Sequence, residues 1–421
     1  MSLKWKSCKI GDVVSVRRGA SPRPIKDYVS ETGMPWVKIA DATKDQTRFI
    51  NFTNEFIKEE GIEKSVVVNP GDLIVSNSAT PGLPKFMNIK ACVHDGWLVF
   101  DSYNGILKDF LYYYFIVIRG QLVNQANGSV FKNLKTDIVR NFDINLPDLE
   151  TQKKIVKILS QIDKKIEINI EINKNLEQYL FYIFDETFMN FEFNEFSNSH
   201  DKIPQSWNLG TFNDIIDTLG SGDWGKDELT GNYTKEVYCI RGADIPDVKQ
   251  GNKGKMPIRY ILPKNFENKK LNENNIILEI SGGSPTQSTG RTVFITEDFL
   301  NRFDKDLICT NFCKIIKPVS NYEIFIYLYF NYLYDKDVMF AYENGTTGIK
   351  NFDIKSFINN FLIVIPSQED VTNFNKLVKD VFDIIMHNGL EIEKLQKLRD
   401  TLLPKLMSGE IDVSKINCDL E

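Results

Sequence analysis

The sequence has few of the residues that bind metals or act as catalytic bases. Only three histidines occur among 421 residues, His94, His200 and His387, and they lie far apart along the chain. Six cysteines are present, and the closest pair, Cys309 and Cys313, has no second Cys or His pair nearby to complete a zinc site. We therefore expect packing or surface histidines, reduced structural thiols and no metal site.

Long apolar runs are also missing. The longest are Phe110–Ile118 and Ile324–Phe330, well short of the roughly 20 residues that cross a bilayer. The first residues contain no apolar run of the length that a secretory signal needs, because lysines and an aspartate interrupt them. The sequence therefore predicts a cytoplasmic protein that does not contact a membrane.

Several catalytic motifs are absent. The sequence contains no G-x-S-x-G, no H-E-x-x-H and no Asn/Asp-Pro-Pro-aromatic motif of the kind that methyltransferases use. Gly220–Lys226 fits the G-x4-G-K pattern of a phosphate-binding loop, but Asp227 stands where the magnesium-binding Ser or Thr belongs. We expect a chain that is not an enzyme and binds no cofactor itself.

An excess of basic charge is lacking as well. Lys and Arg total 51 against 57 for Asp and Glu, which gives a formal net charge of −6. This balance argues against a uniformly basic surface, but binding depends on where the charges lie. The hydrophobic content of 42% is ample for packed cores.

The sequence does contain an internal repeat. Trp5 and Trp207, 202 residues apart, each precede an apolar stretch, and similar segments then follow in the same order in both halves. Each half ends on Leu-Pro or Ile-Pro, and a long helical pattern follows. The matched segments are Trp36–Asp41 with Tyr238–Asp244, Asn69–Gly82 with Asn272–Thr286, and Asn127–Pro147 with Asn344–Pro366.

The two long helical patterns carry heptad seams that coincide at an offset of 219 residues. Asn169 and Asn388 occupy matching positions, and a buried Asn in a seam penalises misaligned pairings. We expect the two helices to pair in a fixed register; alternatively, each Asn lies at a wet helix edge. The predicted helix-pairing residues are Ile155, Leu159, Ile162, Ile166, Asn169, Leu176, Val378, Val381, Ile385, Asn388, Ile392 and Leu395.

The fold class that follows is α+β: two tandem domains separated by two long helices that pack as an antiparallel coiled coil with pseudo-twofold symmetry. Mixed strand and helix patterns without regular βαβ spacing disfavour a parallel sheet. The predicted boundaries are 1–148 for the first domain, 149–190 for the first helix, 191–366 for the linker and second domain, and 367–421 for the second helix and tail.

Polar, glycine-interrupted loops occur at equivalent places in both halves. They combine Arg and Lys with Ser, Thr, Asn and Gln, which suit phosphate contacts and hydrogen bonds to base edges. Surface turns with positive φ are the alternative interpretation. These loops are 16–23, 76–82 and 127–133 in the first half, and 220–226, 281–291 and 344–350 in the second.

Two segments carry a family resemblance. Leu395–Ile411 (LQKLRDTLLPKLMSGEI) resembles the distal conserved helix of specificity subunits of type I restriction-modification systems, and Asn175–Phe193 resembles their central conserved helix. The likeness covers essentially the whole chain. It implies a non-catalytic subunit with two target-recognition domains, each reading one half of a bipartite, asymmetric sequence in double-stranded DNA.

The resemblance also implies partners. Two methyltransferase subunits would dock on the helices and carry S-adenosylmethionine, and ATP-driven restriction subunits would join them. A rival from another class is a coiled-coil adaptor that binds protein partners without reading DNA. A further rival is a specificity module that acts with a methyltransferase alone.

The candidate DNA-binding residues follow from these loops. The cations are expected at phosphates or guanine edges, and the uncharged side chains are candidates for base readout. The cations are Arg17, Arg18, Arg23, Lys38, Lys85, Lys132, Lys226, Arg241, Arg291 and Lys350, and the uncharged residues are Asn77, Ser78, Thr80, Thr286, Gln287 and Thr289.

Overall fold

The protein divides into two compact units in a computed structural model. The first unit comprises Met1–Glu167 and Leu395–Glu421, and the second comprises Ile168–Lys394. The structure describes residues 5–44, 47–125, 133–189, 203–283, 287–345 and 350–416. Each unit contains a sheet domain together with part of both long helices, so these units do not coincide with the predicted domain boundaries, which separate domains from helices.

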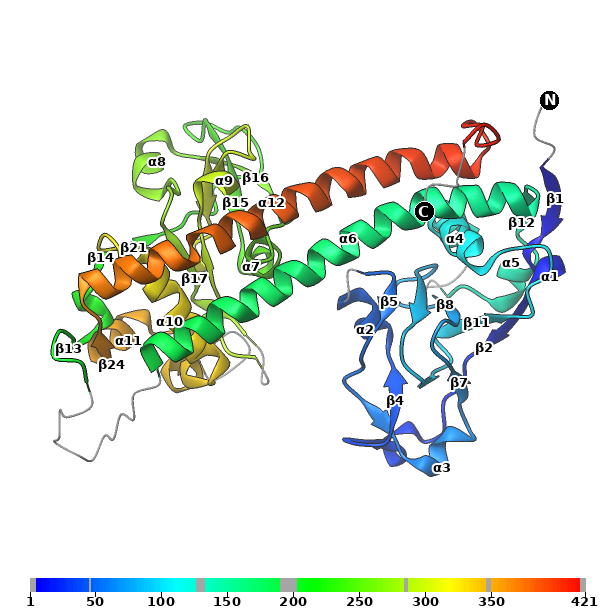
Figure 1. Cartoon of the computed structure of the whole chain (residues 1–421), viewed down its shortest axis with the longest axis horizontal. Helices are drawn as coiled ribbons and strands as arrows, with labels where there is room; N and C mark the ends of the chain where they lie inside the picture. Colours follow the sequence, from blue (N-terminus) through cyan, green and yellow to red (C-terminus); the bar gives the residue numbers. More distant parts are fainter. Residues whose placement is uncertain are drawn as a thin grey trace. The chain divides into compact units, whose positions relative to one another are not determined.

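The first unit contains strands β1 to β12 and helices α1 to α5, with the beginning of α6 and the end of α12. Figure 1 shows both long helices. In order, the elements are β1 (Lys6–Lys9), α1 (Ile10–Val13), β2 (Ser15–Arg18), the 3-10 turn Ile25–Asp27, β3 (Val29–Ser30), β4 (Met34–Val37), α2 (Ile39–Lys44), β5 (Phe49–Ile50), β6 (Phe56–Ile57), α3 (Glu59–Ile62), β7 (Val66–Val68), β8 (Leu73–Ser76), β9 (Pro84–Met87), β10 (Ala91–Val93), β11 (Trp97–Asp101), α4 (Lys108–Gln125), α5 (Thr136–Arg140), β12 (Asp143–Leu146) and α6 (Leu149–Phe184).

The second unit repeats this plan. After α6 and a π-helical turn at Asp185–Met189, its elements are β13 (Asn208–Thr211), β14 (Ile216–Ser221), β15 (Lys235–Ile240), α7 (Ile245–Lys249), β16 (Ile258–Ile261), α8 (Pro263–Lys269), β17 (Ile276–Glu279), β18 (Ser281–Gly282), β19 (Thr292–Phe294), α9 (Glu297–Leu300), β20 (Leu307–Cys309), β21 (Cys313–Pro318), α10 (Glu323–Asp335), β22 (Glu343–Asn344), β23 (Lys350–Phe352), α11 (Ile354–Asn360), β24 (Leu362–Ile365) and α12 (Gln368–Met407). Short 3-10 turns lie at Phe212–Asp214, Gly242–Asp244 and Val338–Tyr342.

Sheet topology confirms the internal repeat. The order β2-β11-β8-β9 in the first unit matches β14-β21-β17-β19 in the second. The parallel pair β4 and β10 matches the parallel pair β15 and β20. In both halves the first strand pairs antiparallel with the last, β1 with β12 and β13 with β24. The two halves therefore share one fold, although they differ widely in sequence.

An aromatic-rich helix closes the core of each sheet domain, α4 in the first and α10 in the second. Tyr113 and Phe115 of α4 are fully buried, as are Phe325 and Phe330 of α10. These segments include the longest apolar runs of the sequence, and their burial explains them. Among the described residues, no helix is long and apolar enough to cross a membrane.

Helices α6 and α12 pack antiparallel within each unit. In the first unit Asp163 of α6 lies 3.0 Å from the Arg399 guanidinium of α12. In the second, Asn169 Nδ2 donates to Glu391 Oε2 at 2.7 Å. From the first pair to the second, the residue number in α6 increases while the residue number in α12 decreases, as expected for antiparallel helices. Every predicted seam residue is buried or half-buried.

The asparagines of the seam do not pair as their equivalent positions in the sequence repeat suggest. Asn388 Nδ2 donates to Asn173 Oδ1 at 2.9 Å, whereas Asn169 contacts Glu391. Asn173 Nδ2 also donates to the carbonyl oxygen of Ile385 at 3.0 Å. All three asparagines are buried, so they do not lie at a wet helix edge. The amide pair that joins the helices is Asn173 with Asn388.

Candidate nucleic-acid interface

The strand register of the first unit brings several loops to one edge of its sheets. β2 and β8 end beside the beginning of β11, since Arg18 pairs with Leu98 and Ser76 with Trp97. β4 and β10 run parallel and end together. All of these ends meet at the turn His94–Gly96. We call 17–23, 38, 77–80 and 94–96 the first convergent edge.

Asp95 holds the basic residues of the first convergent edge in place. Its carboxylate accepts a hydrogen bond from Ser21 Oγ at 2.6 Å and lies 3.5 Å from both Arg18 and Arg23. The Ser21 hydroxyl, together with these guanidinium groups, holds the pKa of Asp95 below its usual value. The two arginine side chains remain 50% and 72% exposed. Two cations are thus fixed around one carboxylate with their outer faces in solvent.

His94 is a packing residue at this edge. Its ring lies 6.0 Å from the ring of Trp36 and 6.5 Å from that of Trp97. Nδ1 accepts a hydrogen bond from the Gly96 amide at 2.8 Å. Burial lowers the pKa of His94, which favours the neutral ring. Lys38 Nζ forms an ion pair with Glu55.

The second unit has an equivalent edge. β14, β15, β17 and β20 end where β21 begins, because Ser221 pairs with Lys314, Glu279 with Cys313, and Ile240 with Cys309. β18 pairs with β23, so Ser281 and Gly282, at the start of one predicted loop, lie opposite Asn351 and Lys350, at the end of another. We call the described residues 221–226, 241, 279–283, 287–291, 310–312, 343–345 and 350 the second convergent edge.

Three cations of the second convergent edge form ion pairs with carboxylates. Arg241 lies 2.9 Å from Asp244, Arg291 2.6 Å from Glu279, and Lys350 2.8 Å from Glu343. Hydrogen bonding to Asp244 raises the pKa of Arg241. Lys226 is exposed, with its ammonium group over the Tyr233 ring. Arg17 of the first edge is paired in the same way, with Asp101 at 3.0 Å.

Three of the predicted residues are buried. Asn77 donates to the Asp95 carbonyl oxygen, and Thr289 donates to Glu343, so both form contacts inside their domains. Lys85 lies in β9 rather than in a loop, and it donates to the Thr47 carbonyl oxygen. Ser78 and Thr80 are half-buried, and Gln287 is exposed. Lys132 and Thr286 lie outside the described residues.

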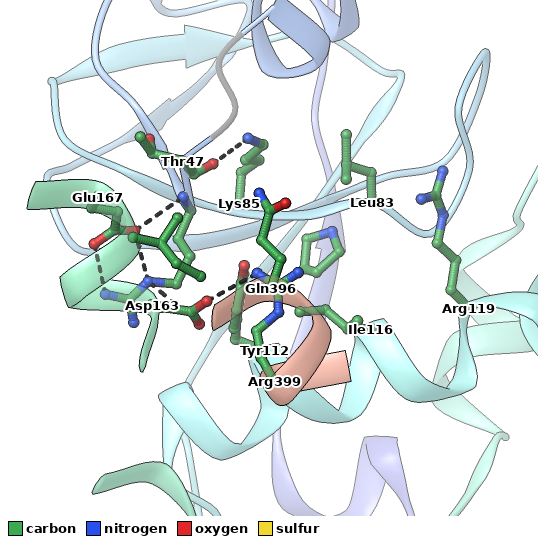
Figure 2. A pocket seen from close by; sticks show the side chains of 13 residues that line it. Thr47, Leu83, Lys85, Tyr112, Ile116, Arg119, Asp163, Glu167, Gln396 and Arg399 are labelled. Carbon is green, nitrogen blue, oxygen red and sulfur yellow. Dashed lines mark hydrogen bonds and ion pairs between the residues drawn. The ribbon is translucent and has the colours of Figure 1, made fainter. Parts of the chain in front are cut away.

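Sequence reasoning missed an ionic cluster that joins the first sheet domain to its helices. A cavity of about 200 Å³ lies there (Figure 2). Arg48 forms hydrogen bonds to both Glu167 oxygens at 2.8 and 2.9 Å. Asp163 accepts a hydrogen bond from the Tyr113 hydroxyl at 2.7 Å and one from Arg399 at 3.0 Å. We call these five residues the ionic joint; no local motif indicates it, because Arg48, Tyr113 and Arg399 lie far along the sequence from Asp163 and Glu167.

The second sheet domain meets its helices through glycine instead. Gly251 follows α7, and its carbonyl group packs directly on Gly389 of α12. Asn173 of α6 donates to the Gln250 carbonyl oxygen at 3.0 Å. Beside them, buried Arg302 reaches the Gly251 carbonyl oxygen and Glu393. We call Asn173, Gly251, Asn388 and Gly389 the glycine joint.

These features define a class of protein in which two sheet domains of one topology alternate with two long antiparallel helices. Within the described residues, no group of three or more His, Cys, Asp or Glu residues is arranged to hold a metal ion. Residues 2–178 match a family model described as the type I restriction modification DNA specificity domain.

Similar proteins extend this match to the whole chain. The MjaIX specificity subunit of Methanocaldococcus jannaschii is 26% identical over 98% of this chain and 94% of its own length. The HindI specificity subunit of Haemophilus influenzae is 21% identical over 97% and 99%. A crystal structure of a type I system S subunit from M. genitalium has the same fold, with a TM-score of 0.53, 15% identity and 96% coverage of both chains. Over nearly its whole length the chain is thus similar to specificity subunits of type I restriction-modification systems.

Proposed function

We propose that this chain is a non-catalytic subunit that reads a bipartite, asymmetric DNA target, one half-site at each convergent edge. The observation that carries the proposal is the repetition of the edge: equivalent strands end together in both units and gather basic and polar side chains there. Arginines held by carboxylates keep a fixed geometry, which suits bidentate contacts to guanine or phosphate. The net charge of −6 is compatible with this, because the cations are concentrated locally.

The first prediction concerns Arg18 and Arg23. Replacing both with Ala removes two exposed guanidinium groups from one edge, and we expect affinity for the cognate DNA to fall by about tenfold or more. Methylome sequencing of the host should show relaxed sequence at one half-site, with the other half-site and the spacer unchanged. Fluorescence anisotropy at several salt concentrations separates the two kinds of contact, because losing phosphate contacts reduces the salt dependence of binding, whereas losing base contacts does not.

Lys153→Ala is the matched control, because Lys153 is an exposed cation that pairs with Glu150 at the start of α6, away from the edge. It should leave both half-sites unchanged. If the double arginine variant retains the full target sequence and affinity, the first convergent edge does not read DNA. If the wild-type protein binds all DNA sequences equally, or binds no DNA, the result favours the alternative function of a coiled-coil adaptor that binds only protein partners.

We further propose that the long helices dock two methyltransferase subunits, through which restriction subunits join. S-adenosylmethionine and ATP would then be bound by those partners and not by this chain. Support comes from exposed apolar residues on one face of α6 in the second unit. Ile168, Ile172, Tyr179 and Tyr182 are spaced by four, seven and three residues, which aligns them in one stripe. Such a stripe is costly in water unless a partner covers it.

The second prediction tests this stripe. Changing Tyr179 and Tyr182 to Ser should weaken assembly with the methyltransferase subunit of the same system by at least about tenfold, because buried tyrosines dominate many interfaces. Analytical ultracentrifugation of the purified mixture measures the loss. Phe52→Ala, which removes an exposed ring of the first sheet domain, should leave assembly intact. Undiminished assembly of the tyrosine variant contradicts the docking surface.

A further inference from the structure

The two convergent edges differ chemically at equivalent positions. Gly19 follows β2 and Gly222 follows β14, and each packs against the turn that precedes the next strand of its sheet. A Cβ on Gly19 would lie 2.9 Å from the His94 carbonyl carbon, and one on Gly222 would lie 2.5 Å from that of Thr310. The two loops therefore leave their sheets at the same place and can be compared residue by residue.

Counting from these glycines, Trp224 of the second edge corresponds to Ser21 of the first, and Lys226 corresponds to Arg23. Phe312 immediately precedes β21, as Gly96 immediately precedes β11. The first edge thus presents hydroxyl and guanidinium groups around Asp95. The second presents two aromatic rings, which are 40% and 53% exposed.

The Trp224 ring is held in a fixed position. The Arg259 guanidinium lies 4.0 Å from the ring centroid, and Arg259 Nε donates to the Trp224 carbonyl oxygen at 2.7 Å. Asp227 pairs with the same guanidinium, and the Arg259 side chain is almost completely buried. A cation over the ring face stabilises this arrangement. The indole is therefore preorganised, although much of its surface remains in water.

Phe312 is also fixed by its backbone. Its amide donates to Thr310 Oγ1 at 3.2 Å, and its carbonyl oxygen accepts from the Ile280 amide at 2.9 Å. Single exposed apolar residues are common and need no explanation. The second edge differs from this, because two rings lie on fixed backbone at an edge whose equivalent is polar. Exposed Lys226, two residues after Trp224, suits a phosphate, and the rings suit an apolar group of the bases.

We propose that Trp224 and Phe312 determine specificity at the half-site of the second domain by contacting the C5-methyl group of thymine. This methyl group is the apolar feature that the major groove presents, and aromatic side chains contact it. The inference rests on the proposed DNA-reading function and adds the base that the second domain requires. It predicts at least one A·T pair in that half-site, and a half-site of G·C pairs alone overturns it.

The test replaces each thymine of the cognate DNA, one at a time, with uracil, which lacks only the methyl group. The half-site that the Arg18 and Arg23 variant leaves unchanged belongs to the second domain. We expect uracil at one position there to weaken binding of the complete complex by about fourfold, the value of one buried methyl group. With Trp224→Ala or Phe312→Ala, the same uracil should have no further effect.

Controls separate the possible causes of failure. Leu362→Ala removes an exposed apolar side chain of β24, and it should respond to uracil like the wild type. Trp224→Phe keeps a ring and should keep part of the uracil effect. If uracil weakens binding of both alanine variants as much as it weakens binding of the wild type, the inference is wrong. It is also wrong if the alanine variants keep their DNA contacts and lose assembly with the methyltransferase subunit. If the wild type binds no specific sequence, the proposed function itself fails.

Discussion

Gly389→Ala should destabilise the second unit, although alanine is the better helix former. The added methyl group would overlap the Gly251 carbonyl oxygen and lie 2.8 Å from Gly251 Cα. Both obstacles are backbone atoms, which cannot rotate away as a side chain can. Overpacking of this kind costs about 1–3 kcal/mol. Because the clash is with backbone atoms, we take the upper end of this range, about 3 kcal/mol. After a gain in helix propensity of about 1 kcal/mol, the free energy of unfolding should fall by about 2 kcal/mol.

Gly120→Ala is the matched control for this substitution. Gly120 lies inside α4, and a Cβ there would meet nothing within 4 Å. That variant should gain about 1 kcal/mol, because only the helix propensity changes. Hydrogen exchange measured by mass spectrometry should show faster exchange at α7 and α12 in the Gly389 variant alone. Equal stabilities for the two variants would mean that the glycine joint is not tightly packed.

The second large effect is expected from Asp163→Asn, which removes the charge at the centre of the ionic joint and keeps the size of the side chain. Asp163 is 2% exposed and lies within 4 Å of two guanidinium groups, those of Arg48 and Arg399. Removing one partner of a buried ion pair costs up to about 3–5 kcal/mol, and here Arg399 would keep only the exposed Asp400 as a carboxylate partner. Calorimetry should therefore show a much lower transition for the first unit.

Asp400→Asn provides the comparison, because Asp400 contacts the same Arg399 but is mostly exposed. Its loss should cost less than about 1 kcal/mol, as for most exposed ion pairs. The double variant Asp163→Asn with Arg399→Gln should recover part of the loss, because it removes the cation that has lost its buried partner. An Asp163 variant as stable as the Asp400 variant would show that the ionic joint does not hold the first sheet domain.

The sequence was sufficient to predict the helices and the repeat. The helix after Pro147 begins at Leu149 as predicted, because the heptad seam starts directly after the proline. Equivalent strands were found because their segments recur in the same order. The seam was visible because apolar residues alternate in steps of four and three.

The sequence could not reveal partners that are distant along the chain. Asn388 was matched to Asn169 by repeat position, but antiparallel packing brings it to Asn173. Lys85 resembles a loop cation in sequence and is a buried strand residue in the structure, because the turn after β8 ends at Leu83. Trp224 and Phe312 carry no motif, and only the strand register brings their loops to one edge.

The pairing of the first and last strands of each sheet domain has a consequence for how such chains can change. Lys6 lies opposite Leu146, and Asn208 lies opposite Ile365, so each domain enters and leaves its helices through one two-stranded ladder. Domains whose ends are adjacent tolerate transplantation, since the surrounding chain keeps its path. A gene could therefore exchange one sheet domain for another as a cassette in a single recombination event, while the two long helices stay the same. Under the proposed function, such an exchange would change one half of the DNA target and leave the docking surface unaltered.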